Sequence, residues 1–237
     1  MTCLPPRIFL LSPARLDGKR AHLLFHPVTM FPVARALRST GGAPIGEIFT
    51  FLSGLYFRGK LAYAEAFARP PQGLNSGVFV ITPNRGLVAP SVRMTLDDLT
   101  GLAETDIDPC AEEFREPLQQ DAMSLAQALG PSGEPVLLGS IATPKYVDVL
   151  SAFSQELLFP AEFVGRGDMS RGGLMLRSVD AHRELAYVPV RGAIRARRPG
   201  TETASSVVSI LNAMHSGTQS APMYFDGIHA SRKAAAS

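Results

Sequence analysis

Side chains that can act as acids or bind anions stand directly after the first apolar run of the sequence. The run RIFLLS ends at Ser12, and the loop over residues 12–20 carries Arg15 and Asp17. A carboxylate such as Asp17 can activate water or stabilise a developing positive charge. Arg15 adds a permanent cation that suits phosphate. The loop is therefore a first candidate for a reaction site.

Two further loops place polar side chains after an apolar run. Residues 82–86 follow VFVI, and residues 139–146 follow PVLL and lead toward a predicted helix, whose free N–H groups favour an anion. The candidates in these loops are an amide that can read a base edge and groups that can bind phosphate or a leaving group: Asn84, Arg85, Ser140 and Lys145. Turn formation alone also explains the glycine, proline, asparagine and serine of both loops.

A fourth loop, residues 165–173, combines arginines with a second candidate carboxylate. It reads GRGDMSRGG and carries Arg166, Asp168, Ser170 and Arg171. Arginines this close together beside small residues have no common role in turns. Guanidinium groups pair with phosphate in two-pronged geometry, so the loop is a candidate phosphate or leaving-group site.

The run LYFRGKLAYAEAF, residues 55–67, has the spacing of a helix. Its predicted buried stripe is Leu55, Phe57, Leu61, Ala64 and Phe67. Gly59 lowers helix propensity by about 1 kcal/mol, so we expect close packing or a ligand beside it. Arg58 and Lys60 flank this glycine and are either phosphate contacts or ordinary surface charges.

Apolar runs alternate with helical patterns along most of the chain. The predicted strands are residues 7–12, 77–83, 135–140, 157–165 and 185–190. The predicted helices are residues 44–68, 95–103, 108–130, 143–155 and 168–182. This alternation predicts an α/β fold with a parallel, mostly buried central sheet and right-handed crossovers. Ligands of such sheets bind at the carboxyl ends of the strands.

Length and composition set the class of protein. The 237 residues, 46% hydrophobic and 19% charged, suit one domain, predicted over residues 1–198. No window is apolar enough to span a membrane, and the opening run is a poor signal peptide. Residues 199–237 predict a low-complexity tail with one short helix. Two cysteines cannot form a disulfide framework, which favours the cytoplasm.

Charge and motifs narrow the chemistry further. The net charge is only +2, but residues 165–198 hold eight arginines against three acidic residues. This basic segment is either a phosphate-binding surface or a solvated face. The sequence has no dinucleotide, P-loop, nucleophile-elbow or zinc-protease motif. His22 and His26 have the spacing of metal ligands but no third partner, so we expect no metal and no other cofactor.

Three segments together resemble a known superfamily. The segments LYFRGKLAYAEAF and VFVITPNRGLVAPSVRMTLDDL resemble a widespread uncharacterised bacterial and archaeal domain that is similar to the uracil-DNA glycosylase-like superfamily. The segment VLLGSIATPKY resembles a strand and turn of those glycosylases. The resemblance covers roughly residues 7–190 and implies a three-layer α/β/α fold. The loops SPARLDGKR and GRGDMSRGG replace the water-activating and leaving-group motifs of the uracil enzymes. The resemblance therefore implies a different substrate base, and an antiviral role against phages with modified DNA.

The implied activity is hydrolysis of the N-glycosidic bond of a modified base in DNA, after the base has been flipped out of the duplex. The candidate catalytic carboxylates are Asp17 and Asp168. The candidate base-binding residues are Ser12, Tyr56, Phe57 and Asn84. The candidates for phosphate or leaving-group binding are Arg15, Arg58, Arg85, Ser140, Lys145, Arg166, Ser170 and Arg171.

Two other classes of function fit the same residues. A noncatalytic nucleic-acid or nucleotide-binding module, linked to RNA modification or stress response, would use the same basic loops without forming an abasic product. A scaffold would instead use the tail to dock a protein partner.

Overall fold

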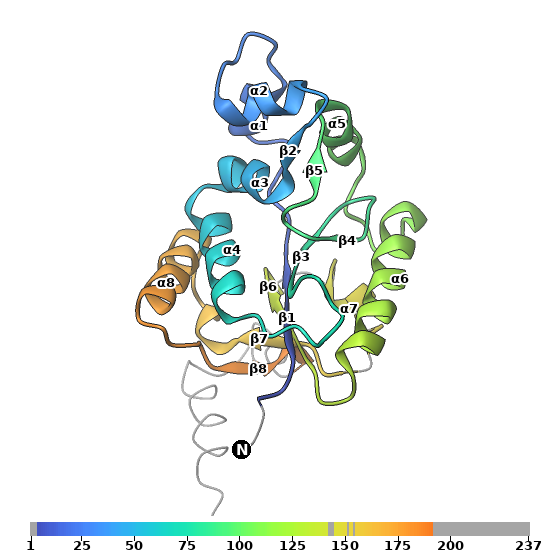
Figure 1. The fold of residues 1–237 in the computed structure, drawn as a ribbon, viewed down its shortest axis with the longest axis vertical. Coiled ribbons are helices and arrows are strands. Elements are labelled where there is room, and N and C mark those ends of the chain that lie inside the picture. The colour runs from blue at the N-terminus through green and yellow to red at the C-terminus, as the bar shows by residue number, and fades with distance from the viewer. Residues whose placement is uncertain (1–3, 142–144, 151, 154, 192–237) are drawn as a thin grey trace, which may run out of the picture. The chain divides into compact units, whose positions relative to one another are not determined.

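The computed structural model describes residues 4–141, 145–150, 152–153 and 155–191 (Figure 1). A six-stranded sheet lies at its centre, with the order β4-β3-β1-β6-β7-β8. Its strands are β1 (Arg7–Leu11), β3 (Val78–Ile81), β4 (Leu87–Val88), β6 (Glu134–Leu138), β7 (Leu158–Pro160) and β8 (Tyr187–Pro189). This arrangement confirms the predicted mixed α/β fold with a mostly parallel sheet.

β1 is central because all five of its residues are apolar or carry a long aliphatic stem, and all are buried. It pairs in parallel with β3 through Phe9 and Val78, and with β6 through Phe9 and Val136. β6 also pairs in parallel with β7, whereas β4 and β8 run antiparallel at the two edges. Strands buried on both faces read as continuous apolar runs, which is why the sequence pattern identified them.

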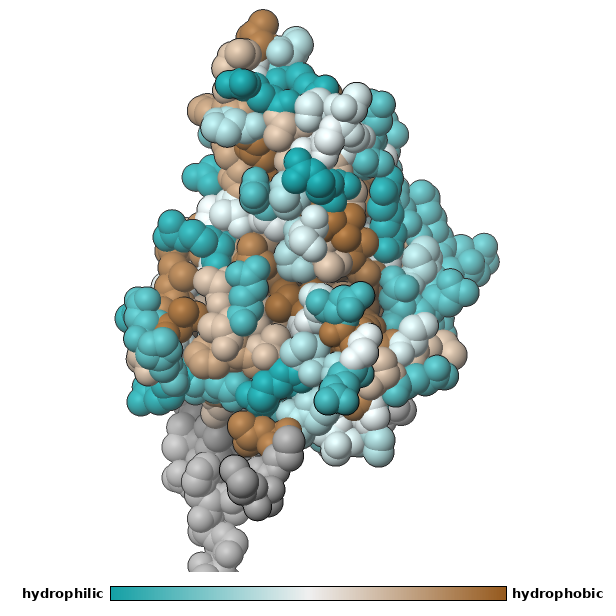
Figure 2. All heavy atoms as spheres, viewed as in Figure 1, coloured by the Kyte–Doolittle hydropathy of each residue, from teal (hydrophilic) through white to brown (hydrophobic). Residues whose placement is uncertain are grey.

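Helices cover both faces of the sheet (Figure 1). α4 (Leu55–Phe67) and α8 (Asp168–Asp180) lie on one face and α6 (Glu112–Leu129) on the other. Figure 2 shows hydrophilic side chains over the outward surface of α6. The inward side of α6 is buried through Phe114, Leu118 and Leu125, at the spacing of one helix face. No helix within the described residues is long and apolar enough to cross a membrane.

The predicted helix over 44–68 is two helices, α3 (Ile45–Ser53) and α4. The break lies at Gly54, whose φ of 60° is in the region that favours glycine. A side chain there would also meet the Arg20 guanidinium, which donates to the carbonyl of Phe51 at 3.0 Å. Apolar spacing continues across this break, so the pattern alone did not reveal it.

Several elements beyond the carboxyl ends of the strands were not predicted. They are α1 (Lys19–Phe25), α2 (Pro32–Arg38) and a small sheet of β2 (Ala43–Pro44) and β5 (Arg93–Met94). α5 (Leu96–Glu104) was predicted and begins with a capping box between Thr95 and Asp98. α7 (Val147–Leu150) is shorter than predicted within the described residues, and a short 3₁₀ helix (Ala161–Phe163) follows β7. The predicted tail lies outside the described residues.

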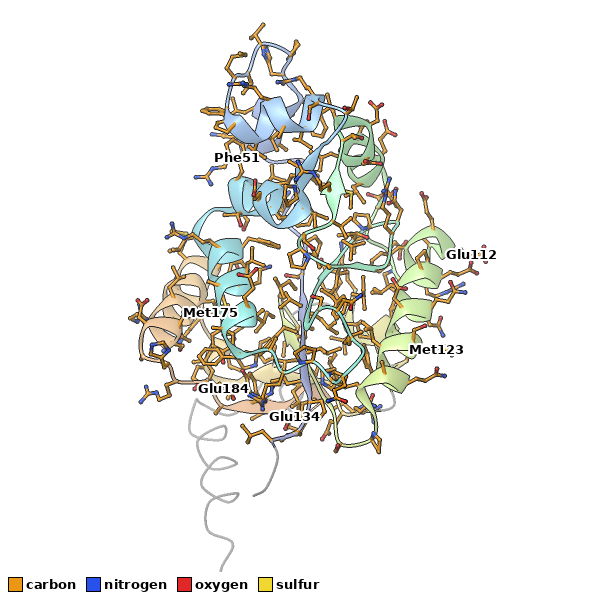
Figure 3. All side chains as sticks on the ribbon, in the orientation of Figure 1. Phe51, Glu112, Met123, Glu134, Met175 and Glu184 are labelled. Atoms are coloured by element: carbon orange, nitrogen blue, oxygen red, sulfur yellow. The ribbon has the colours of Figure 1, made fainter. Side chains whose placement is uncertain are left out.

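An ion-pair network fixes the opposite end of the sheet, where β1 begins. Arg7 pairs with Glu134 and Glu184, and Arg69 Nη1 lies 2.7 Å from a Glu184 carboxylate oxygen. Figure 3 labels Glu134 and Glu184 at this end, away from α1 and α2. The Arg7 guanidinium also lies 4.6 Å from the Tyr187 ring centroid. This network ties β1, β6 and the start of β8 together without contributing to the carboxyl edge.

α4 and α8 cross with their backbones in contact. A side chain at Gly59 would place its Cβ 2.7 Å from the carbonyl oxygen of Gly172, and one at Gly172 would lie 2.7 Å from that of Leu55. Two glycines facing each other therefore allow the helices to approach this closely. The crossing accounts for the helix-weakening glycine in α4, where the sequence had predicted close packing or a ligand.

Neighbouring glycines in α8 test this crossing. Gly172→Ala forces a Cβ against main-chain atoms, and we expect it to lower the free energy of unfolding by about 1–3 kcal/mol. Gly173→Ala meets only the flexible end of Arg177 at 3.3 Å, so its better helix propensity should leave stability unchanged or raise it by about 0.5–1 kcal/mol. Urea unfolding measures the free energy of unfolding of each variant. Equal changes in Gly172→Ala and Gly173→Ala would contradict the backbone contact.

Candidate functional site

A pocket of about 430 Å³ lies at the carboxyl ends of β1 and β6. Ser12 follows β1 and Ser140 follows β6, while Tyr56 and Asp168 come from the first turns of α4 and α8. The chain leaves β1 toward β3 on one side and later returns to β6 on the other side. A crevice at such a reversal of strand order is where α/β sheets bind ligands.

Lys60 lies directly behind this pocket and is only 1% exposed. Its Nζ atom lies 2.6 Å from the main-chain oxygen of Ser12 and 3.0 Å from Ser12 Oγ. The amine also lies 4.5 Å from the ring centroid of Tyr56 and 4.9 Å from that of Phe57. Within the described part of the chain, no carboxylate forms an ion pair with it.

Burial lowers the pKa of the Lys60 amine to about 7, because the charged form loses its hydration. The negative charge of Asp168 acts against this decrease and the positive charge of Arg171 adds to it. The close crossing of α4 and α8 brings both groups near the amine. Near neutral pH the site therefore contains an amine that can gain or lose a proton.

Tyr56 contributes the second unusual group. Its hydroxyl is buried, has no hydrogen-bond partner among the described residues, and belongs to a side chain that lines the pocket. Burial raises the pKa of Tyr56, and the nearby Arg171 guanidinium partly opposes this rise. Arg171 is itself buried and donates from Nη2 to the carbonyl of Phe163 at 3.0 Å. The pocket therefore presents the Tyr56 ring to a ligand, while the hydroxyl itself lies inside the protein near Arg171.

Cations stand around the mouth of the pocket. Arg15, Lys19 and Arg20 all line it and are exposed. Arg15 also forms a two-pronged ion pair with Asp17, at 2.7 and 3.0 Å. This pair lowers the pKa of Asp17. The arrangement suits an anionic ligand whose planar part reaches inward toward Tyr56 and Tyr146.

The structure brings several of the predicted residues together in this pocket. Ser12, Arg15, Tyr56, Ser140 and Asp168 line it. A neighbouring pocket of about 400 Å³, on the other side of the same loop, is lined by Arg15, Asp17 and Lys145 among others. The two candidate carboxylates therefore belong to different pockets.

Other predicted residues lie elsewhere. Phe57 is fully buried in the core with its ring edge-on to Phe49, so it does not face the pocket. Arg58 is exposed on α4 and does not line the pocket. Arg166 and Ser170 are exposed and hydrogen-bond each other at 3.2 Å.

The predicted base-reading loop instead binds to α5. The Asn84 amide donates to the carbonyl of Gly101 at 3.0 Å and to Thr105 Oγ1 at 2.9 Å. Arg85 forms an ion pair with Asp98. Both donor groups are therefore engaged in holding the β3–β4 loop.

Sequence analysis missed the burial of Lys60, which had been proposed as a phosphate contact or a surface charge. Both interpretations are wrong, because the residue is inside the protein. The buried face of α4 comprises Tyr56, Gly59, Lys60 and Tyr63 together with Phe57 and Ala64. The predicted stripe was therefore rotated partly away from this face. Spacing of three and four residues around Lys60 was the signal that could have revealed it.

No group of three or more histidine, cysteine, aspartate or glutamate side chains in the described ranges could hold a metal ion. No protein-family model, curated protein or solved structure matches this chain. The resemblance to the uracil-DNA glycosylase-like superfamily therefore stays a prediction.

The buried amine predicts a pH dependence of stability. Between about pH 7 and 10.5 the unfolded chain keeps the Lys60 proton and the folded chain does not, so rising pH favours folding. We expect the free energy of unfolding to rise from pH 7.5 to 9 more steeply than in Lys60→Met, by about 1 kcal/mol per pH unit. Urea unfolding at several pH values measures both slopes. Equal slopes would contradict the burial of a titrating amine.

Proposed function

We propose that this protein hydrolyses the N-glycosidic bond of a modified base in DNA. The observation that carries the proposal is the content of one pocket: the Asp168 carboxylate, the aromatic side chains of Tyr56 and Tyr146, and a cationic mouth. The proposal includes the uracil-DNA glycosylase-like fold, which is compatible with a mostly parallel sheet between helices on both faces. It also includes DNA as the partner.

Each part of the pocket matches one requirement of the reaction. A base flipped out of the duplex needs an aromatic surface and hydrogen-bonding groups, which Tyr56, Tyr146 and Ser12 supply. Breaking the bond leaves positive charge on the sugar, which the Asp168 carboxylate can stabilise. Arg15 and Lys19 at the mouth can hold the flanking phosphates.

The structure distinguishes the two candidate carboxylates by their surroundings. Both carboxylates are exposed, but Asp17 is paired with Arg15 and lines the neighbouring pocket. Asp168 lines the same pocket as Tyr56 and Ser12, and its charge acts on the buried Lys60 amine. We therefore assign the catalytic carboxylate to Asp168.

The test is incubation of the full chain with unmodified bacterial DNA, phage DNA containing hydroxymethylated or glucosylated cytosine, and a duplex containing uracil. Alkaline cleavage detects abasic sites and mass spectrometry identifies the released base. We expect release from one modified DNA. Asp168→Asn should slow it by about 100-fold or more. Asp180→Asn, at the exposed end of the same helix, is the matched control.

Retention of DNA without release of any base would contradict hydrolysis and favour the noncatalytic binding module. Equal loss of activity in Asp17→Asn and Asp168→Asn would contradict the assignment of the carboxylate. No retention of any of these DNAs would contradict the whole proposal.

A further inference from the structure

The hydroxyl of Ser12 and the amine of Lys60 have the geometry of a nucleophile and its base. We propose that Ser12 is a nucleophile, activated by Lys60, that accepts the acyl group of an anionic ester. This activity goes beyond the proposed function and does not rest on it, because it breaks a different bond and requires no DNA.

The distances support a proton transfer from Ser12 to Lys60. The amine lies 3.0 Å from Ser12 Oγ and 2.6 Å from the main-chain oxygen of the same residue. A neutral amine can donate to the carbonyl and at the same time accept the hydroxyl hydrogen. The main-chain carbonyl of Ser12 therefore holds the Lys60 amine in the orientation in which it can activate the Ser12 hydroxyl. Serine–lysine pairs of acyl-transfer enzymes use the same two groups.

The burial of Lys60 is difficult to explain as packing alone. An apolar side chain would fill the space between Ser12, Tyr56 and Phe57 without the cost of removing an amine from water. Its burial, the nearby Arg171 guanidinium and the absence of an ion pair among the described residues favour the uncharged form, whereas the ring faces of Tyr56 and Phe57 favour the charged one. A buried lysine that is uncharged near neutral pH is suited to act as a base.

The other parts of an acyl-transfer site are present around Ser12. Gly139 packs so closely that a Cβ on it would lie 2.9 Å from Ser12 Cβ, which fixes the position of the nucleophile. The Tyr56 side chain lines the same pocket as Ser12 and forms an aromatic wall beside the nucleophile. Arg15 and Lys19 at the mouth favour an anionic ester, such as an acylated nucleotide.

The reaction is balanced by these groups and water. Ser12 Oγ bonds to the carbonyl carbon while its proton moves to Lys60 Nζ. The tetrahedral intermediate then breaks its bond to the alcohol oxygen, which takes the proton from Lys60 and leaves as the free alcohol. Water attacks the acyl-serine by the reverse proton route, releasing the acid and restoring Ser12.

The experiment is covalent labelling of the full chain with two aryl sulfonyl fluorides, followed by peptide mass spectrometry. Benzenesulfonyl fluoride is neutral, and 4-(fluorosulfonyl)benzoate carries a carboxylate. Ser12 Oγ bonds to sulfur, the S–F bond breaks, and the serine proton leaves with fluoride through Lys60. We expect one label, on Ser12, with a rate that rises as pH increases through about 7.

Three comparisons make the assignment specific. Lys60→Met should slow labelling by at least about 100-fold, the scale of general-base catalysis. Ser178→Ala removes a buried serine of α8 outside the pocket and should leave labelling unchanged. The anionic probe should react several-fold faster than the neutral one at low salt, and this advantage should disappear at about 1 M salt.

The pH dependence of the labelling rate follows from the charged groups around Lys60. The charged groups that act on Lys60 are Asp168 and Arg171 of α8, and the Tyr56 hydroxyl on its own helix lies near both. Asp168→Asn removes the charge that favours the protonated amine, so it should shift the midpoint of the profile to lower pH. A purely structural lysine would not move this midpoint.

Two results would overturn the proposal. The first is no label on Ser12 between pH 6 and 9 in the folded chain. The second is equal labelling rates of the parent chain and of a folded Lys60→Met variant, with folding checked by circular dichroism. If Lys60→Met does not fold, a labelling rate of the parent chain that does not change between pH 6 and 9 would also overturn the proposal. Failure to release bases from DNA would leave these outcomes unaffected.

Discussion

The backbones of α4 and α8 touch where Gly59 faces Gly172, and the candidate site depends on this contact. Helices with side chains at the crossing would lie farther apart. Lys60 directly follows Gly59, and Arg171 directly precedes Gly172. The same contact therefore brings the Lys60 amine and the Arg171 guanidinium near each other. Their repulsion helps to keep the amine uncharged.

The site combines this helix crossing with the ends of two strands. Ser12 directly follows β1, and its carbonyl and hydroxyl both contact the Lys60 amine. Gly139 directly follows β6, where the missing side chain leaves room for Ser12. The reactive groups therefore stand on a buried strand and a packed helix, where neighbours fix their geometry. Exposed basic side chains such as Lys19 surround the opening, where they can attract an anion.

The sequence predicted the sheet better than the site. The runs IFLL and VFVI are apolar throughout because both faces of their strands are covered, so spacing and composition identify them. Lys60 was misplaced because its residue type indicates the surface and only its position on α4 indicates burial. Asn84 has a residue type that suits a ligand, but its partners, Gly101 in α5 and Thr105 just after it, are 17 and 21 residues away and no local pattern indicates them. Long-range contacts decided both cases.

The pKa of the Lys60 amine tests this account most directly. The chain has four lysines, so a carbon-13 NMR titration of labelled lysine side chains resolves each amine, and Lys60→Met assigns the signal. The account predicts one midpoint near 7, for Lys60, well below the ordinary lysine value of 10.5. Four midpoints near 10.5 would contradict it, because the Lys60 amine would then be hydrated and could not serve as a base for Ser12.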